Sequence, residues 1–337
     1  MRGSTIAGFN SDLHRSTEGY ERSLKSLAAR WPIRSLWDLQ GIPLRTVALR
    51  TWKSLISDRV FGHAAELGFY FLFALFPTLF CASSILGLAA RSADQIYDKL
   101  LDYLALVIPT SALGTILATF NETTAASTSG KLTFSLIAAL WSASVGISAI
   151  QDTLNDVYKI KDTRSYFRAR IYAIGLTILL TALISSGLGA MLAGNALAGY
   201  VHHRAHDRLF GVAIATAVRL AAGAVAAAVL SLSFAVLYYW APDRKVRTWH
   251  WLTPGCTVGI AGWLAFSLGF RAYLHFFNTY PVIYGSLGAV IILLMWFYTT
   301  GLMLLTGAEI NSEIEAAAAE KKLAASPMNH AGSGQAS

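Results

Sequence analysis

Apolar residues of this chain gather in six long stretches that contain no Asp, Glu, Lys or Arg. Each has at least about twenty residues, the length that an α-helix needs to cross roughly 30 Å of hydrocarbon. The pattern predicts an all-α integral membrane bundle of six transmembrane helices. The stretches are Leu67–Ala90, Leu132–Gln151, Ile171–His203, Leu220–Pro242, Trp249–Phe270 and Ala272–Ala308. The spans are expected near 67–90, 132–151, 171–193, 220–240, 252–271 and 285–308.

The segment before the first span mixes apolar and charged residues at helical spacing, with Trp52 among the apolar ones. Residues 43–62 are therefore predicted to form an amphipathic helix that lies on the membrane surface. Docking to a soluble partner is the open alternative. The remaining divisions are a mobile cytoplasmic N-terminus, a six-helix transmembrane domain and a largely disordered cytoplasmic tail, at residues 1–42, 63–315 and 316–337.

Basic residues divide unevenly between the two sides that these spans define. Four segments hold 20 of the 27 Lys and Arg: residues 1–62, 151–170, 241–251 and the tail after 308. Cytoplasmic loops carry an excess of Lys and Arg, so both termini are expected in the cytoplasm. A hydrophobic fraction of 55% and a charged fraction of 14% exclude an ordinary soluble domain. The net charge of +8 is explained by the orientation of the protein in the membrane and by contact with anionic lipid headgroups, which are its expected partners. Nucleic acid is not expected as a partner.

Polar residues near the predicted cytoplasmic ends of the spans form the candidate site. Carboxylates this close to hydrocarbon usually face protein or water. The beginning of the first span and the ends of the second and sixth spans share one membrane side, so their side chains are hypothesised to converge. The alternative is that each meets water or headgroups separately. The candidate cluster is Glu66, Tyr70, Asp152, Asn155, Arg164 and Glu309.

Prolines and glycines mark expected kinks and close helix contacts. Pro77 removes a backbone donor in the first span, which predicts a kink or a broken turn. Thr253 is a suitable cap for a helix that begins at Pro254, and Gly285 and Gly288 are expected beside a turn before the last span. We expect the fourth span to begin near Leu220, which places Arg219 at the membrane rim. The alternative is a longer helix that contains Arg219.

Four stretches together resemble the YihY/BrkB family of bacterial inner-membrane proteins, once labelled ribonuclease BN. They are Ala64–Pro77, Leu140–Ser144 with Asp152–Tyr158, Tyr239–Asp243 with Thr253–Gly255, and Tyr284–Val290 with Gly307–Asn311. They follow the family's order and cover roughly residues 45–315. The resemblance implies six helices with cytoplasmic ends and does not imply a specific activity.

Catalytic signatures are missing from the sequence. It contains no phosphate-binding loop, no HExxH and no GxSxG. His202, His203 and His206 lack a fixed fourth ligand nearby, so they are interpreted as a solvated loop and not as a metal site. We therefore expect no enzyme, no cofactor and no metal. The leading hypothesis is a protein that transports a lipid or another amphipathic small molecule or maintains the envelope. A scaffold without transport is the alternative, and an intramembrane enzyme or a ribonuclease is a weaker one.

Overall fold

The computed structural model describes residues 37, 43–88, 129–204, 208–244, 252–276 and 286–325, and its regular elements in these ranges are all helices. The all-α prediction is confirmed for this part of the chain. Five of the helices, α3, α7, α8, α9 and α11, are long and apolar enough to cross a membrane. The helices are α2 (Leu44–Ser57), α3 (Val60–Leu88), α6 (Ser129–Val157), α7 (Tyr166–Arg204), α8 (Arg208–Trp240), α9 (Pro254–Phe276) and α11 (Ser286–Ala325).

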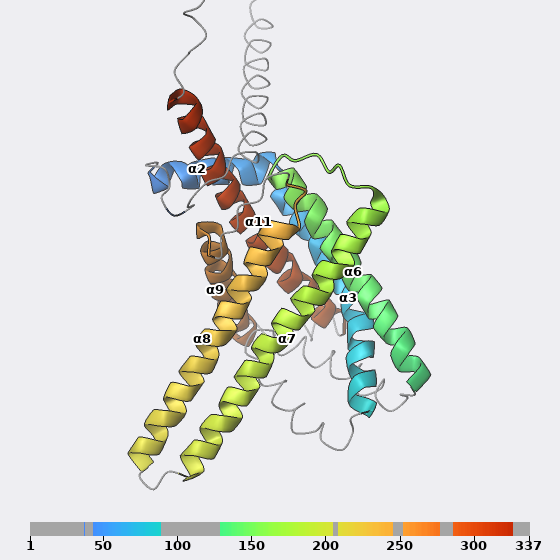
Figure 1. Cartoon of the computed structure of the whole chain (residues 1–337), viewed down its shortest axis with the longest axis vertical. Coiled ribbons are helices and arrows are strands. Elements are labelled where there is room, and N and C mark those ends of the chain that lie inside the picture. Colours follow the sequence, from blue (N-terminus) through green and yellow to red (C-terminus); the bar gives the residue numbers. More distant parts are fainter. Residues whose placement is uncertain are drawn as a thin grey trace, which may run out of the picture.

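Helix α11 organises the fold, since α2, α3, α6 and α9 all contact it. The other helices run as neighbouring pairs, α3 with α6 and α7 with α8. Figure 1 shows these two pairs diverging from the end of the bundle where α2 crosses α11. The main apolar core lies near that end and includes Leu67, Leu154 and Leu305.

Glycines allow α11 to approach its neighbours closely. A Cβ at Gly255 of α9 would lie 1.9 Å from the carbonyl oxygen of Gly307. On the α3 side, a Cβ at Gly301 would lie 3.2 Å from the carbonyl oxygen of Ala64, and one at Gly68 would lie 3.0 Å from the backbone nitrogen of Tyr298. Close backbone approach through small residues is a main source of helix association in lipid.

Helix α3 continues through Pro77, so the break that the sequence allowed does not occur. Proline cannot donate to the carbonyl four residues earlier, which here belongs to Phe73. The Ser142 hydroxyl of α6 donates to that carbonyl oxygen at 3.5 Å. A side chain of a neighbouring helix thus partly replaces the missing backbone donor, as happens for prolines inside membrane helices.

Helices α7 and α8 are longer than the predicted spans, with 39 and 33 residues. Helix α8 begins at Arg208, so Arg219 lies inside it and not before its first turn. This corrects the preferred start near Leu220. The side chain of Arg219 is exposed, and an exposed arginine is a good helix former, so its charge does not end the helix.

Helix α11 also exceeds its predicted span near 285–308, because it continues as far as Ala325. Residues 316–325, expected to begin a largely disordered tail, are helical, and Ala316–Ala319 are buried. The reason is packing against α2, where Ile314 and Ala318 contact Val47. Alanine is the best helix former, so this short run can extend the helix once α2 covers it.

Candidate functional site

A network of hydrogen bonds joins the end of α6 to the turn after α8. The Asn155 amide donates to Asp162 at 3.1 Å, and its oxygen accepts the backbone N–H of Asp243 at 2.8 Å. Asp243 in turn accepts both the backbone N–H and the hydroxyl of Thr163, at 2.9 and 2.7 Å. Arg164 donates to Asp162 through Nη2 at 2.6 Å and to the Ala241 carbonyl at 3.3 Å. We call Asn155, Asp162, Thr163, Arg164 and Asp243 the hairpin network.

The charges in the hairpin network compensate one another. Burial raises the pKa of Asp162, but the hydrogen bonds from Arg164 outweigh it, so the pKa lies below its usual value. Burial alone would lower the pKa of Arg164, yet Asp162 and Asp243 raise it. The Arg164 side chain is only 6% exposed. Such a buried, fork-like pair fixes geometry, which indicates that Arg164 positions the hairpin.

A second polar region follows the buried end of α11. Arg244 donates to Glu315 at 3.0 Å and lies 3.8 Å above the ring of Tyr158. Burial raises the pKa of Tyr158, so its hydroxyl stays protonated at neutral pH. Asn311 accepts the backbone N–H of Gly255 at 3.0 Å. These contacts tie α6, the turn after α8 and the start of α9 to one helix.

Helix α2 reaches the same end of α11. The Ser54 hydroxyl donates to Glu313 at 2.6 Å, and Arg50 donates to Glu320 at 3.1 Å. Glu313 and Glu320 of α11 are thus both engaged by side chains of α2. Glu309 is fully buried and is among the acids that raise the pKa of Tyr158.

The six candidate residues occupy three environments. Asn155 and Arg164 meet through Asp162, as described above. Glu66 and Asp152 are exposed, and His63 lies 3.5 Å from Glu66. Desolvation, followed by the charge of Asp162, raises the pKa of Asp152.

The remaining two candidates are Tyr70 and Glu309. Tyr70 packs against the main apolar core, and Glu309 lies inside the bundle. Arg164 forms its ion pairs with Asp162 and Asp243, neither of which belongs to the candidate cluster. Arg164 lies close enough to Asp152 to lower that group's pKa in part.

Sequence reasoning missed Asp162, Asp243 and Arg244 as individual site residues. A usable signal existed, because Asp243 ends one of the four stretches that carry the family resemblance and Asn311 ends another. Their partners come from distant positions, 80 residues apart for Thr163 and Asp243. A local sequence pattern cannot show that two residues so far apart form a hydrogen bond.

The predicted packing residues and the histidines are not part of the hairpin network. Helix α9 begins at Pro254, and the backbone N–H of Cys256 donates to the Thr253 hydroxyl at 3.0 Å, as an N-cap does. Gly288 is buried within α11, and His202 is exposed near the end of α7. Gly285 and His206 lie outside the described residues. No group of three His, Cys, Asp or Glu side chains in the described ranges is arranged to hold a metal ion.

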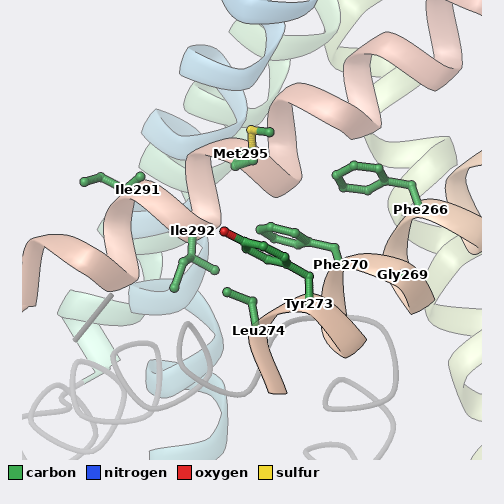
Figure 2. A pocket seen from close by; sticks show the side chains of 8 residues that line it. All are labelled: Phe266, Gly269, Phe270, Tyr273, Leu274, Ile291, Ile292 and Met295. Atoms are coloured by element: carbon green, nitrogen blue, oxygen red, sulfur yellow. The ribbon is translucent and has the colours of Figure 1, made fainter. Parts of the chain in front are cut away.

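An apolar groove lies between α9 and α11, far from the hairpin network. Its volume is about 440 Å³. Figure 2 shows the rings of Phe270 and Tyr273 on α9 opposite Ile292 and Met295 on α11. The two rings are nearly parallel, with centroids 6.4 Å apart. Gly269 lies in the same wall and has open space where a Cβ would point. Because its lining is largely aromatic and aliphatic, the groove can accept an apolar chain through burial of apolar surface, without a polar contact.

Comparison with known proteins places most of the chain in one family. Residues 51–331 match the family described as Virulence factor BrkB. A Bacillus subtilis protein named as ribonuclease-like, YfkH, is 31% identical over 249 residues, which cover 74% of this chain and 88% of that protein. UPF0761 membrane proteins of Stenotrophomonas maltophilia and Xanthomonas oryzae are 29% and 30% identical over 79% of this chain.

These matches cover different shares of the relatives. The chain spans only 60% of the length of the two UPF0761 proteins. No solved structure matches the chain.

Proposed function

The chain belongs to the BrkB family, and from this premise we propose that it is an inner-membrane protein that binds and moves a lipid or another amphipathic molecule. The groove between α9 and α11 carries the proposal. Its volume of about 440 Å³ falls within the roughly 300–1,000 Å³ common for ligand pockets. Aromatic and aliphatic walls suit an acyl chain, and no polar group is needed to hold one.

The proposed topology has six spans, with α6 added to the five apolar helices. Helix α6 has 29 residues and contains the apolar run 132–151, enough to cross a bilayer. Six crossings bring both termini to the same side, and the 20 basic residues of the N-terminal, 151–170, 241–251 and C-terminal segments favour the cytoplasm for that side. In this topology the hairpin network and α2 lie at the cytoplasmic face.

The proposed partners are membrane lipids. The exposed face of α2 carries Leu49, Trp52 and Ile56, which suits the boundary between headgroups and acyl chains. Anionic headgroups would meet the basic residues of the hairpin at 159–170. Nucleic acid is not proposed as a partner.

Reconstitution in liposomes tests lipid movement directly. The purified protein is inserted into vesicles that contain one fluorescent lipid at a time, and transfer between leaflets is followed by quenching from outside. Gly269→Leu fills the open space in the groove and is expected to slow transfer by at least about fivefold, because the occupied volume is lost to the ligand. Gly175→Leu is the matched control, since Gly175 also has open space around its Cβ position but lies on α7.

Two results would contradict the proposal. One is transfer no faster than in protein-free liposomes across a panel of lipids, which would favour a scaffold without transport. The other is equal transfer by the two leucine variants and the unchanged protein.

We propose no catalytic role, although one relative is named as ribonuclease-like. Metal-assisted RNA cleavage requires convergent carboxylates, whereas Asp152 is exposed on α6 and Glu309 is fully buried. Incubation of purified protein with labelled RNA tests this. Cleavage that is lost in Asp152→Asn or Glu309→Gln, at unchanged purity, would establish the ribonuclease instead.

A further inference from the structure

A polar pocket lies where the turn between α2 and α3 meets the end of α6. Its volume is about 440 Å³. Charged and titratable side chains from both segments line it: Asp58, Arg59, His63, Asp156, Lys159 and Lys161. We call this the turn pocket. It shares Asn155 with the hairpin network but none of that network's ion pairs.

Asp58, one of the two acids that line the turn pocket, is engaged by a lysine, and Asp156 lies near a histidine. Lys159 Nζ lies 2.5 Å from Asp58 Oδ1. His63 lies 3.7 Å from Asp156 and 3.5 Å from Glu66. Within the described ranges, neither Arg59 nor Lys161 forms an ion pair or a side-chain hydrogen bond, and both are exposed. The pocket therefore presents two cations that form no ion pair with a carboxylate in the described part of the chain.

The backbone at this pocket is held in an unusual conformation. Arg59 and Lys159 both have φ of 54°, and they are the two residues other than glycine with positive φ in the described part of the chain. A residue with a Cβ adopts this region only at an energetic cost. Each is fixed by its helix end: His63 N–H donates to the Arg59 carbonyl at 3.1 Å, and Lys159 N–H donates to the Asp156 carbonyl at 3.1 Å. The two turns thus hold basic side chains at the rim in spite of that cost.

We propose that the turn pocket binds a phosphate-type anion, with Arg59 and Lys161 as the ligands that carry the charge. A guanidinium matches two phosphate oxygens at once, and an ammonium adds a second point of positive charge. The same chemistry is offered by the phosphate of a lipid headgroup and by free phosphate. The apolar face of α2, with Trp52 and Ile56 exposed, ends at this pocket and favours the lipid source.

This site is separate from the groove. Ser312 of α11 donates to the Val157 carbonyl beside the turn pocket, whereas Ile292 of α11 lines the groove. Twenty residues of helix separate them, about 30 Å at 1.5 Å per residue. Binding at the turn pocket therefore does not depend on lipid movement through the groove, and either proposal can fail alone.

Calorimetry on the purified full chain in a neutral detergent tests the site. The two probes are inorganic phosphate and dihexanoyl phosphatidic acid. The double variant Arg59→Gln/Lys161→Gln is expected to bind at least about tenfold more weakly, because both unpaired cations are gone. The matched control Arg45→Gln/Arg219→Gln removes two exposed cations outside the pocket and the hairpin and is expected to remain within about twofold.

The two probes distinguish the source of the anion. Phosphatidic acid binding at least about tenfold tighter than inorganic phosphate would assign the pocket to a headgroup, because the short chains add apolar contact. Equal affinities would assign it to free phosphate. The proposal is overturned if the wild type binds neither probe, or if the two double variants bind equally.

A labelling experiment on the unchanged protein covers the case of a misfolded variant. Amine acylation is followed by mass spectrometry at Lys161, with Lys53 as the internal reference. Saturating phosphate or phosphatidic acid is expected to slow acylation of Lys161 by at least about threefold relative to Lys53, because the ligand covers that ammonium. Equal protection of both lysines, or of neither, would contradict the site.

Discussion

At the scale of single residues, charge in this protein is neutralised by partners that the fold supplies. Arg164 has Asp162 two positions away and Asp243 from the next turn. Arg244 has Glu315 and the ring of Tyr158. Breaking one side of such a buried pair costs more than the pair itself contributes, because the remaining charge stays desolvated.

Asp162→Asn is expected to lower the melting temperature in detergent at pH 7 by about 3 °C or more. The pKa of Asp162 is lowered by its hydrogen bonds with Arg164, so its contribution is present above the unfolded value of 3.8 and is lost as the pH falls through the folded value. The difference between variant and wild type should therefore shrink below pH 3.8. Melting curves at several pH values measure this.

Asp152→Asn is the control for that experiment, because the pKa of Asp152 is raised and not lowered. Its charged form is disfavoured by the fold, so neutralisation should leave the melting temperature at pH 7 unchanged or higher. A loss as large as that of Asp162→Asn would contradict the assignment of Asp162 as the stabilising acid.

Gly255→Ala is expected to destabilise the protein by about 3 kcal/mol, at the upper end of ordinary overpacking. The new Cβ would meet the carbonyl oxygen of Gly307 at 1.9 Å, and backbone atoms cannot rotate away as a flexible side chain can. Thermal unfolding reports the effect. Gly223→Ala, which meets open space, should change stability by no more than about 0.5 kcal/mol or raise it.

At the scale of elements, the helices follow from hydrophobic runs and local caps, but their ends do not. Thr253 and Pro254 mark the start of α9 at the predicted place. The extension of α11 past 308 depends on Ser54 and Arg244, which lie 259 and 71 positions away from their partners Glu313 and Glu315. No window of local sequence contains both members of such pairs, so local sequence cannot show which partners hold the end of α11.

The candidate site was predictable to a similar degree. The sequence placed Asn155 and Arg164 in one candidate cluster, and in the structure both bond to Asp162. It could not tell that Asp152 faces outward while Glu309 faces inward, because helix ends near a membrane carry acids on either face. Glu309 is fully buried on α11, the helix that α2, α3, α6 and α9 all contact.

Ser54→Ala is expected to loosen α2 from α11 at a cost of about 1–3 kcal/mol, because the largely buried Glu313 loses a hydrogen-bond donor. Hydrogen exchange along residues 44–57 measures the loosening. Ser57→Ala is the matched control, since Ser57 is exposed on the same helix and bonds only to its neighbours. Similar exchange in both variants would show that the contact with Glu313 does not hold α2.

At the scale of the whole molecule, the proposed topology places the two ends of α7 on opposite sides of the membrane. In a variant without Cys81 and Cys256, a cysteine at Arg204 should react with an impermeant maleimide on intact cells. A cysteine at Ser165 should react only after permeabilisation. Both positions are exposed, so accessibility within the protein does not decide the result. The reverse pattern would invert the topology.

The contact between α2 and the end of α11 also sets an order for assembly. Arg50 and Glu320 are separated by 270 positions, so the ribosome must add that many residues after Arg50 before the pair can form. Until then α2 keeps Val47 without the cover of Ile314 and Ala318, even if the earlier spans are already inserted. A chain released before Glu313 would retain this exposed apolar face at the membrane surface, where proteases and chaperones act on incomplete products.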